Sequence, residues 1–373
     1  MDATIVGVDV FAYSVGYAHG EYVMSGGRAA SRQSGTLVRL TTDTGLVGWG
    51  EITPLGATYL PTFTDEIRSA IAFMAPSLLG IDPVNISGVN RLMDSMMLGQ
   101  SYAKSPIDIA CWDLKGQLLG VPISDLLGGS LQETYPVYEP VPLGAPDAMA
   151  RYITERRAVG ISRFQLKVGN EPFADIERCE ASVAAGDSET IVVADANGGW
   201  SLAQARVAVR GLRDLPILLE QPCRTTEDCV LAVRHCDLPL ILDESILSLE
   251  DVEQAKAVAG AVSINVKISR VGGLTNAALF RDAMQAMNLE VSVEDMWGGD
   301  VISAAVSHLA ASTRPESLLM TPLLNELTTD GFIAGHVPRM VDGRASAPTG
   351  PGLGISVSLA TLGDPILSWR LGA

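Results

Sequence analysis

The spacing of apolar residues along this chain changes near residue 135, and the change predicts two kinds of structure. Before it, residues 4–13 and 34–51 have the pattern of antiparallel strands, and residues 43–45 (Asp-Thr-Gly) supply a turn within the second stretch. Residues 64–80 and 105–120 repeat their apolar positions with helical spacing. Strands followed by segregated helices predict an α+β domain for this first part.

From residue 135 onward, eight apolar runs typical of strands alternate with helix-like segments. Eight is the number of units that a (β/α)8 barrel needs. Six of the runs end in a polar residue: Lys167, Asp195, Glu220, Asp243, Lys267, and either Glu294 or Asp295. In such barrels the carboxyl ends of the strands share one mouth. We therefore expect an α/β fold, a (β/α)7-8 modified TIM barrel, with one functional residue at each of these strand ends.

The last part of the chain is rich in Gly and Pro and contains no further strand–helix unit. We expect it to return and pack on the N-terminal domain. The predicted division is an α+β capping domain over residues 1–130, a catalytic barrel over 131–336 and a C-terminal segment over 337–373.

Composition narrows the classes of function. The chain has 373 residues, is 47% hydrophobic and carries a net charge of −17. So acidic a chain is poorly suited to neutralise phosphates, which argues against nucleic acid and an anionic membrane surface as partners. The N-terminus lacks the pattern of a signal peptide, and no apolar run reaches the roughly 18 residues of a membrane span. We therefore expect a cytoplasmic protein.

Three carboxylates, Asp195, Glu220 and Asp243, each end a strongly apolar strand. Buried charges must be paired or coordinated, because bare burial costs several kcal/mol or more. Each acid could pair with a nearby Lys or Arg, but three acids converging at one mouth repel one another. A hard divalent cation relieves that repulsion, and all-oxygen ligands favour Mg²⁺ over Mn²⁺.

Two lysines, Lys167 and Lys267, lie inside apolar runs rather than at a solvated surface. They end the second and sixth of the eight strands, on opposite sides of the acidic ones. Desolvation lowers the pKa of a lysine, so that it can act as a base near neutral pH. A lysine base beside Mg²⁺ suits removal of a proton next to a carboxylate, because the metal stabilises the resulting enediolate.

The motifs at these strand ends resemble those of the muconate lactonizing enzyme subgroup of the enolase superfamily. They are Lys167-Val168-Gly169, Asp195-Ala196-Asn197, Glu220-Gln221-Pro222, Asp243-Glu244-Ser245 and residues 267–274. The resemblance implies that the three acids hold one Mg²⁺ per subunit and that the two lysines are the acid–base pair. We expect Asn197 and Glu244 to orient the metal ligands. The resemblance also implies a homo-oligomer.

One departure from the subgroup concerns the second strand. The subgroup usually carries Lys-x-Lys there, whereas this chain has Gln165 before Lys167. The change removes a positive neighbour that would depress the pKa of Lys167. It is also expected to alter how the substrate carboxylate is held.

Two families share the motifs that bear on the substrate. Residues 293–300, Gln165-x-Lys167 and Thr58-Tyr59 resemble the 4-hydroxyproline betaine 2-epimerases, in which an aromatic pair faces a quaternary ammonium. This resemblance makes Tyr59, Asp295 and Trp297 the candidate substrate-binding residues. Residues 25–28, 102–113 and 362–365 instead resemble the cis-3-hydroxy-L-proline dehydratases.

The predicted activity is racemisation or epimerisation of a small carboxylate, either a proline betaine or an amino acid. Dehydration of cis-3-hydroxy-L-proline is the alternative, since both reactions need an acid–base group on each face of the substrate. A cycloisomerase is a lesser alternative. An acid-sugar dehydratase usually places a histidine at the end of the seventh strand, where this chain has none. A non-catalytic binding protein would have no need of two lysines and three acids at strand ends.

Overall fold

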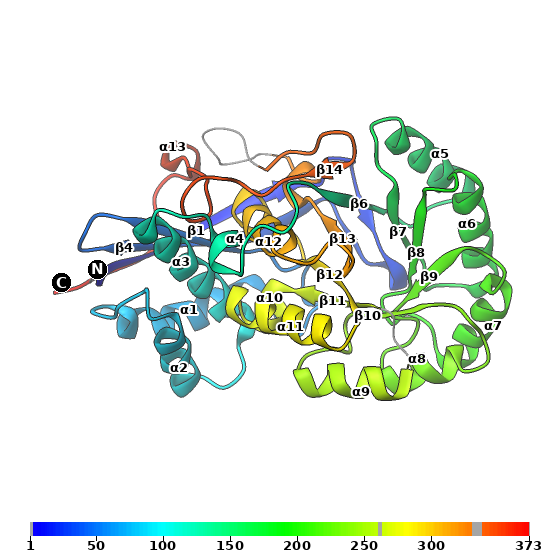
Figure 1. The fold of residues 1–373 in the computed structure, drawn as a ribbon, viewed down its shortest axis with the longest axis horizontal. Coiled ribbons are helices and arrows are strands. Elements are labelled where there is room, and N and C mark those ends of the chain that lie inside the picture. The colour runs from blue at the N-terminus through cyan, green and yellow to red at the C-terminus, as the bar shows by residue number, and fades with distance from the viewer. Residues whose placement is uncertain (1–2, 260–262, 330–337, 373) are drawn as a thin grey trace.

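The computed structural model describes residues 3–259, 263–329 and 338–372. It contains an antiparallel sheet with helices beside it and a closed parallel barrel, and the two chain ends lie together at that sheet (Figure 1). The predicted barrel with an N-terminal α+β domain is confirmed. No helix in these three ranges is both long enough and apolar enough to cross a membrane.

The N-terminal sheet has the strand order β15-β1-β4-β5 and is antiparallel. Its strands are β1 (Ile5–Gly16), β4 (Arg32–Thr42), β5 (Val47–Ile52) and β15 (Leu367–Arg370). A small hairpin is formed by β2 (Tyr22–Val23) and β3 (Ala29–Ala30), joined by the 3-10 turn η1 (Ser25–Gly27). The helices of this part are α1 (Thr64–Leu78), α2 (Ile86–Met96), α3 (Ser101–Leu119) and α4 (Ile123–Leu126).

Helix α3 packs closely on β5 because two glycines of that strand leave room for its backbone. A Cβ atom at Gly50 would lie 1.8 Å from the carbonyl oxygen of Pro106, and one at Gly48 would lie 2.3 Å from that of Ala110. The helix begins at Ser101, four residues before the predicted start, and α2 was not predicted from the sequence.

The barrel closes through pairing of its first and last strands, β6 and β13. Its strands are β6 (Tyr135–Val141), β7 (Arg163–Lys167), β8 (Ile191–Asp195), β9 (Ile217–Glu220), β10 (Leu240–Leu242), β11 (Ser263–Lys267), β12 (Glu290–Glu294) and β13 (Leu318–Pro322). The segments between and after them form α5 (Pro146–Arg157), α6 (Pro172–Ala184), α7 (Leu202–Leu212), α8 (Thr226–Val233), α9 (Leu249–Ala259), α10 (Ile268–Val271), α11 (Leu274–Ala286), α12 (Asp300–Ala311) and η2 (Leu324–Glu326). All eight strands coincide with the eight apolar runs of the sequence.

The C-terminal part of the chain touches both regions. It contributes β14 (Arg344–Ala345), which pairs with β6 of the barrel, and α13 (Leu359–Leu362). Its last strand, β15, then pairs with β1 of the N-terminal sheet. The three-part division of the chain stays a prediction, and its boundary at residues 336 and 337 lies outside the described residues.

Candidate active site

Strand register brings the predicted functional residues to one level of the barrel. Lys167 is the register partner of Asp195, Asp195 is that of Glu220, and Lys267 is that of Glu294. Asp243 follows β10 directly. None of these residues is more than 5% exposed. The parallel barrel therefore buries two cations and four carboxylates in one layer.

Each lysine contacts a carboxylate and lies near a tyrosine ring. Lys167 pairs with Asp195, and its Nζ lies 5.9 Å from the centre of the Tyr22 ring. Lys267 pairs with Asp243, and its Nζ lies 5.8 Å from the centre of the Tyr59 ring. The two sides of the site are thus built alike.

The expectation that desolvation lowers the pKa of these lysines is wrong for the structure as it stands. Desolvation is the largest single effect and acts in that direction, but Asp195 and the other acidic groups around Lys167, Glu220 among them, together outweigh it and raise the pKa of Lys167 well above its usual value. The charges of Asp243 and Glu294 do the same for Lys267. Sequence reasoning counted burial and omitted the acid that the neighbouring strand supplies.

Glu220 lies at the centre of the acidic group and is held by two amides. Nε2 of Gln165 donates to both of its oxygens at 3.1 and 2.9 Å, and Nδ2 of Asn265 donates to Oε1 at 2.7 Å. Burial, together with the charges of Asp195 and Asp243, raises the pKa of Glu220 well above its usual range. Gln165 therefore supplies neutral donors where the subgroup usually has a charged lysine.

The acids at the strand ends fit a hard cation. Among the described residues, Glu220, Asp243 and Glu294 present oxygens that all lie within 4.8 Å of one another. The predicted set has Asp195 in place of Glu294, and Asp195 adjoins Glu220 in register. Two further buried oxygens have no hydrogen-bond partner: Oδ1 of Asn197 and Oε2 of Glu244. Each could bind such an ion or accept a hydrogen bond from its hydration shell.

Of the two residues predicted to orient these acids, Asn197 contacts Asp195 directly and Glu244 contacts Asn197. The backbone N–H and Nδ2 of Asn197 donate to Asp195 at 2.9 and 2.8 Å, and Nδ2 also donates to Glu244 at 3.0 Å. Sequence reasoning gave no role to Arg270, which is buried and pairs with Oδ1 of Asp243 at 2.6 Å. Burial would raise the pKa of Asp243, but Arg270 and Lys267 outweigh it and hold the pKa low.

A cavity lies between the lysines on the side of β12, β13 and β6. Its walls are Tyr22, Leu55, Tyr59, Tyr138, Pro140, Gln165, Lys167, Lys267, Glu294, Asp295, Met296, Trp297, Pro322, Leu324 and Leu327. It thus contains all three predicted substrate-binding residues. Its mostly apolar and aromatic lining with a few charged groups is typical of small-ligand sites.

The three predicted substrate-binding residues differ in what they offer a ligand. The hydroxyl of Tyr59 lies 3.2 Å from Nζ of Lys267. Trp297 is buried against the rings of Tyr17 and Tyr22, and its Nε1 has no hydrogen-bond partner. The oxygens of Asp295, by contrast, already accept from the backbone of Ser269, its hydroxyl, and the Met296 N–H.

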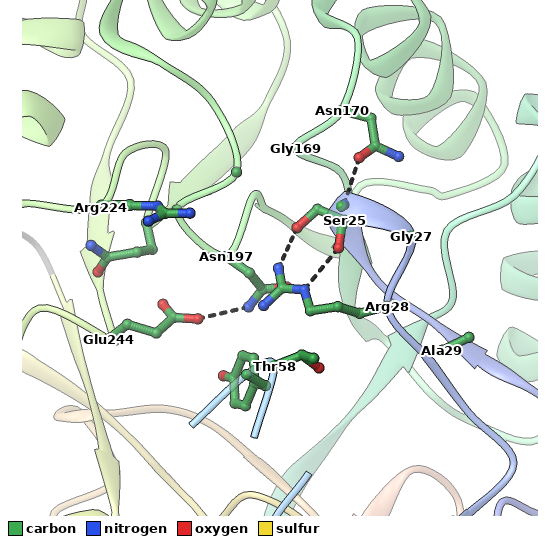
Figure 2. Close-up of a pocket in the computed structure, with 15 residues that line it drawn as sticks. Ser25, Gly27, Arg28, Ala29, Thr58, Gly169, Asn170, Asn197, Arg224 and Glu244 are labelled. Atoms are coloured by element: carbon green, nitrogen blue, oxygen red, sulfur yellow. Dashed lines mark hydrogen bonds between the residues drawn. The ribbon is translucent and has the colours of Figure 1, made fainter. Parts of the chain in front are cut away.

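A second, more polar cavity lies at the barrel rim beside the first. The loop that joins β2 to β3 reaches the rim here, since the N–H of Gly26 donates to Asn170 at 2.8 Å and Oγ of Ser25 donates to the Ala196 carbonyl at 3.2 Å. Arg224 and Glu244 lie on the far side of the cavity from this loop (Figure 2). Tyr59 lines both cavities.

The comparisons with known proteins agree with this geometry. Residues 8–128 match the family of the mandelate racemase / muconate lactonizing enzyme N-terminal domain, and residues 148–361 match the enolase C-terminal domain-like family. The chain belongs to the mandelate racemase / muconate lactonizing enzyme family of the enolase superfamily.

Individual relatives extend over the whole chain. A cis-3-hydroxy-L-proline dehydratase of Roseibium aggregatum is 40% identical over 97% of this chain and 98% of its own. An N-succinyl-L-Arg/Lys racemase of Bacillus cereus is 29% identical over 87% and 88%.

Solved structures give the same result. A mandelate racemase/muconate lactonizing enzyme from Roseovarius nubinhibens has a TM-score of 0.95 at 36% identity, covering 99% of both chains. An enolase superfamily member from that organism, complexed with magnesium, has a TM-score of 0.92 at 36% identity, covering 99% and 100%. The predicted family and class are confirmed: the chain is an enolase-superfamily enzyme, a racemase/epimerase or a dehydratase.

The loop that carries Trp297 is held in place by a glutamate of the N-terminal sheet. Glu51 accepts from the N–H groups of Gly299 and Ile302 at the start of α12, and the hydroxyl of Tyr13 also donates to it. Burial raises the pKa of Glu51 to about 7. One buried carboxyl thus joins the capping sheet to the rim of the site.

We expect Glu51→Gln to change how stability depends on pH. Between pH 4.5 and 7 the folded chain keeps a proton that unfolded Glu51 releases, so the stabilisation is complete below pH 4.5 and is lost as pH rises through 7. Wild type should lose on the order of 3 kcal/mol relative to Glu51→Gln across that window. Denaturant unfolding at pH 5, 6, 7 and 8 measures it. The exposed Glu21→Gln is the control, and identical pH profiles for wild type and Glu51→Gln would refute the account.

Proposed function

We propose that the protein removes the proton from the carbon next to a substrate carboxylate. In this proposal Lys167 and Lys267 are the acid–base pair, and Asp195, Glu220 and Asp243 hold one Mg²⁺ per subunit. The observation that carries it is the arrangement of two buried lysines on opposite strands with the acids on the strands between them. A homo-oligomer and a cytoplasmic location stay predictions.

This arrangement of lysines and acids overcomes the main obstacle to the reaction. A proton next to a carboxylate is weakly acidic, because its removal adds a second negative charge to the carboxylate. When bound, Mg²⁺ supplies positive charge where that negative charge develops. The carboxylate charges that raise the pKa of the lysines are offset once Asp195 and Asp243 hold a cation, so that one lysine can be uncharged and accept the proton. The lysine on the opposite strand delivers a proton to the other face. Walls of Leu324, Leu327 and Trp297 limit the access of water to both lysines.

The first candidate reaction is dehydration of a cis-3-hydroxyproline-type amino acid. One lysine takes the α-proton, the freed electron pair forms the double bond between the α- and β-carbons, and the C–O bond at the β-carbon breaks. The second lysine protonates the departing hydroxyl, which leaves as water. The relative that is 40% identical over nearly the whole chain, a cis-3-hydroxy-L-proline dehydratase, supports this reaction.

The second candidate is epimerisation of an amino acid or proline betaine. The similar surroundings of the two lysines, each beside a tyrosine ring, favour it, since both must then exchange roles. The racemase among the relatives supports it further. Consumption of cis-3-hydroxy-L-proline without interconversion of enantiomers would select the first candidate, and interconversion alone would select the second.

Replacing either lysine should separate their roles. Lys167→Ala and Lys267→Ala should each lower turnover roughly 10²- to 10⁴-fold, because each removes a general acid–base group. Each variant should still exchange the α-proton of one enantiomer with D₂O, the one that faces the surviving lysine. NMR of D- and L-proline in D₂O measures this exchange. Lys115→Ala, outside the barrel mouth, is the control, and near wild-type turnover in either barrel variant would contradict the proposal.

Removing and restoring the metal tests whether Asp195, Glu220 and Asp243 bind it. EDTA should abolish activity and Mg²⁺ should restore it. Glu220→Gln should weaken binding of Mn²⁺, a spectroscopic substitute for Mg²⁺, by at least roughly 10- to 100-fold. Electron paramagnetic resonance of free Mn²⁺ gives the affinity without an assay of activity. Glu227→Gln on α8 should bind as wild type, whereas full activity in metal-free protein would overturn the assignment.

A further inference from the structure

The two lysines divide the strand ends into two arcs. The arc of β8, β9 and β10 carries Asp195, Glu220 and Asp243, and the arc of β12, β13 and β6 faces the cavity. On the proposed function, on which this inference rests, the substrate carboxylate lies at the acidic arc. The nitrogen and the rest of the substrate must then point toward β12, β13 and β6.

The arc of β12, β13 and β6 carries a buried carboxylate, one oxygen of which accepts no hydrogen bond from the described residues. Glu294, at the end of β12, is 2% exposed. Its Oε2 accepts from the hydroxyl of Tyr138 at 2.5 Å. Its Oε1 accepts no hydrogen bond and forms only an ion pair, with Nζ of Lys267 at 3.5 Å, among the described residues. A buried carboxylate oxygen that has a distant ion pair but no hydrogen-bond donor gains from a donor on a bound ligand.

The neighbouring acid, Asp295, was the predicted substrate-binding residue, but both of its oxygens already accept hydrogen bonds, from Ser269 and from the Met296 N–H, and so gain less from a ligand. Glu294 is instead the register partner of Lys267 and lines the same cavity as both lysines. A donor bound between the lysines therefore meets Glu294.

We propose that Oε1 of Glu294 accepts a hydrogen bond from the ammonium group of the substrate. The substrate class is then an α-amino acid whose nitrogen retains hydrogen, such as a proline, rather than a betaine. A fully methylated nitrogen keeps its positive charge but cannot donate, so it leaves Oε1 without a hydrogen-bond donor. The rings of Tyr22, Tyr59 and Trp297 attract either kind of cation and do not distinguish them.

A different role for Glu294 is that of a metal ligand with Glu220 and Asp243, since their oxygens lie within 4.8 Å of one another. The position of β12 on the far side of Lys267 from β10 favours contact with the substrate nitrogen instead. The two roles differ in one measurable property. Removing a metal ligand weakens metal binding, whereas removing an amine acceptor does not.

The test measures binding of L-proline and of its N,N-dimethyl betaine to the Mg²⁺-loaded protein by calorimetry. Wild type should bind L-proline roughly 10- to 100-fold more tightly than the betaine, because a hydrogen bond to a charged group is lost. Glu294→Gln should bring that ratio toward one and leave the Mn²⁺ affinity unchanged. Glu290→Gln, at the other end of the same strand, should behave as wild type.

Three outcomes would overturn the assignment: wild type binding the betaine as tightly as L-proline, an unchanged ratio in Glu294→Gln, or loss of Mn²⁺ affinity in that variant. The wild-type ratio decides the matter even if Glu294→Gln does not fold. Exchange of the α-proton of L-proline with D₂O in wild type keeps the proposed function separate. If exchange occurs and the ratio fails, only the role of Glu294 is wrong; if neither ligand binds and nothing exchanges, both proposals are wrong.

Discussion

The burial of like charges at one level of a parallel barrel is the constraint on which this structure depends. Register places Asp195 beside Glu220, and Asp243 follows the next strand, so three carboxylates share a space almost without water. Their repulsion and desolvation would favour protonation, as the raised pKa of Glu220 shows. Such an arrangement is stable only with compensating positive charge and hydrogen-bond donors.

The partners of the acids differ in charge, and this difference decides which acid stays ionised. Asp243 contacts two cations, Arg270 and Lys267, and stays ionised. Glu220 receives only the neutral amides of Gln165 and Asn265. Of Asp195, Glu220 and Asp243, Glu220 is therefore the acid that contacts no cation in the described structure. Gln165 occupies the position where the subgroup usually has a second lysine. A bound cation must therefore neutralise more of the charge of Glu220.

Much of the fold and of the site could be predicted because a parallel barrel fixes where each strand ends. Once the eight apolar runs were recognised, a polar residue at each strand end had to face the common mouth, which located Lys167, Asp195, Glu220, Asp243 and Lys267. The pairing register of neighbouring strands, by contrast, could not be predicted from the sequence. The sequence offered either Glu294 or Asp295 as the end of the seventh strand and favoured Asp295 for the substrate. Both line the cavity, and only the register pairing of Lys267 with Glu294 and the hydrogen bonds that Asp295 accepts from Ser269 and Met296 distinguish them.

Contacts between distant segments explain the other omissions. Tyr22 reaches Lys167 from a two-residue strand of the capping domain, and no local pattern marks it. Tyr138 lies in an apolar run that reads as core. Glu51 ends a predicted strand, but its bonds to the start of α12 join residues about 250 positions apart. Hydrophobic periodicity identifies elements, whereas partners across the fold depend on how those elements pack.

The most direct test of the central claim is a crystal structure of the protein with Mn²⁺ and pyrrole-2-carboxylate, a planar analogue of a deprotonated proline. Anomalous scattering locates the metal independently of the protein coordinates. The account predicts Mn²⁺ bound by Asp195, Glu220 and Asp243, with Nζ of Lys167 and Nζ of Lys267 on opposite faces of the ring carbon that bears the carboxylate. Both lysines on one face, or the metal bound away from these acids, would contradict it.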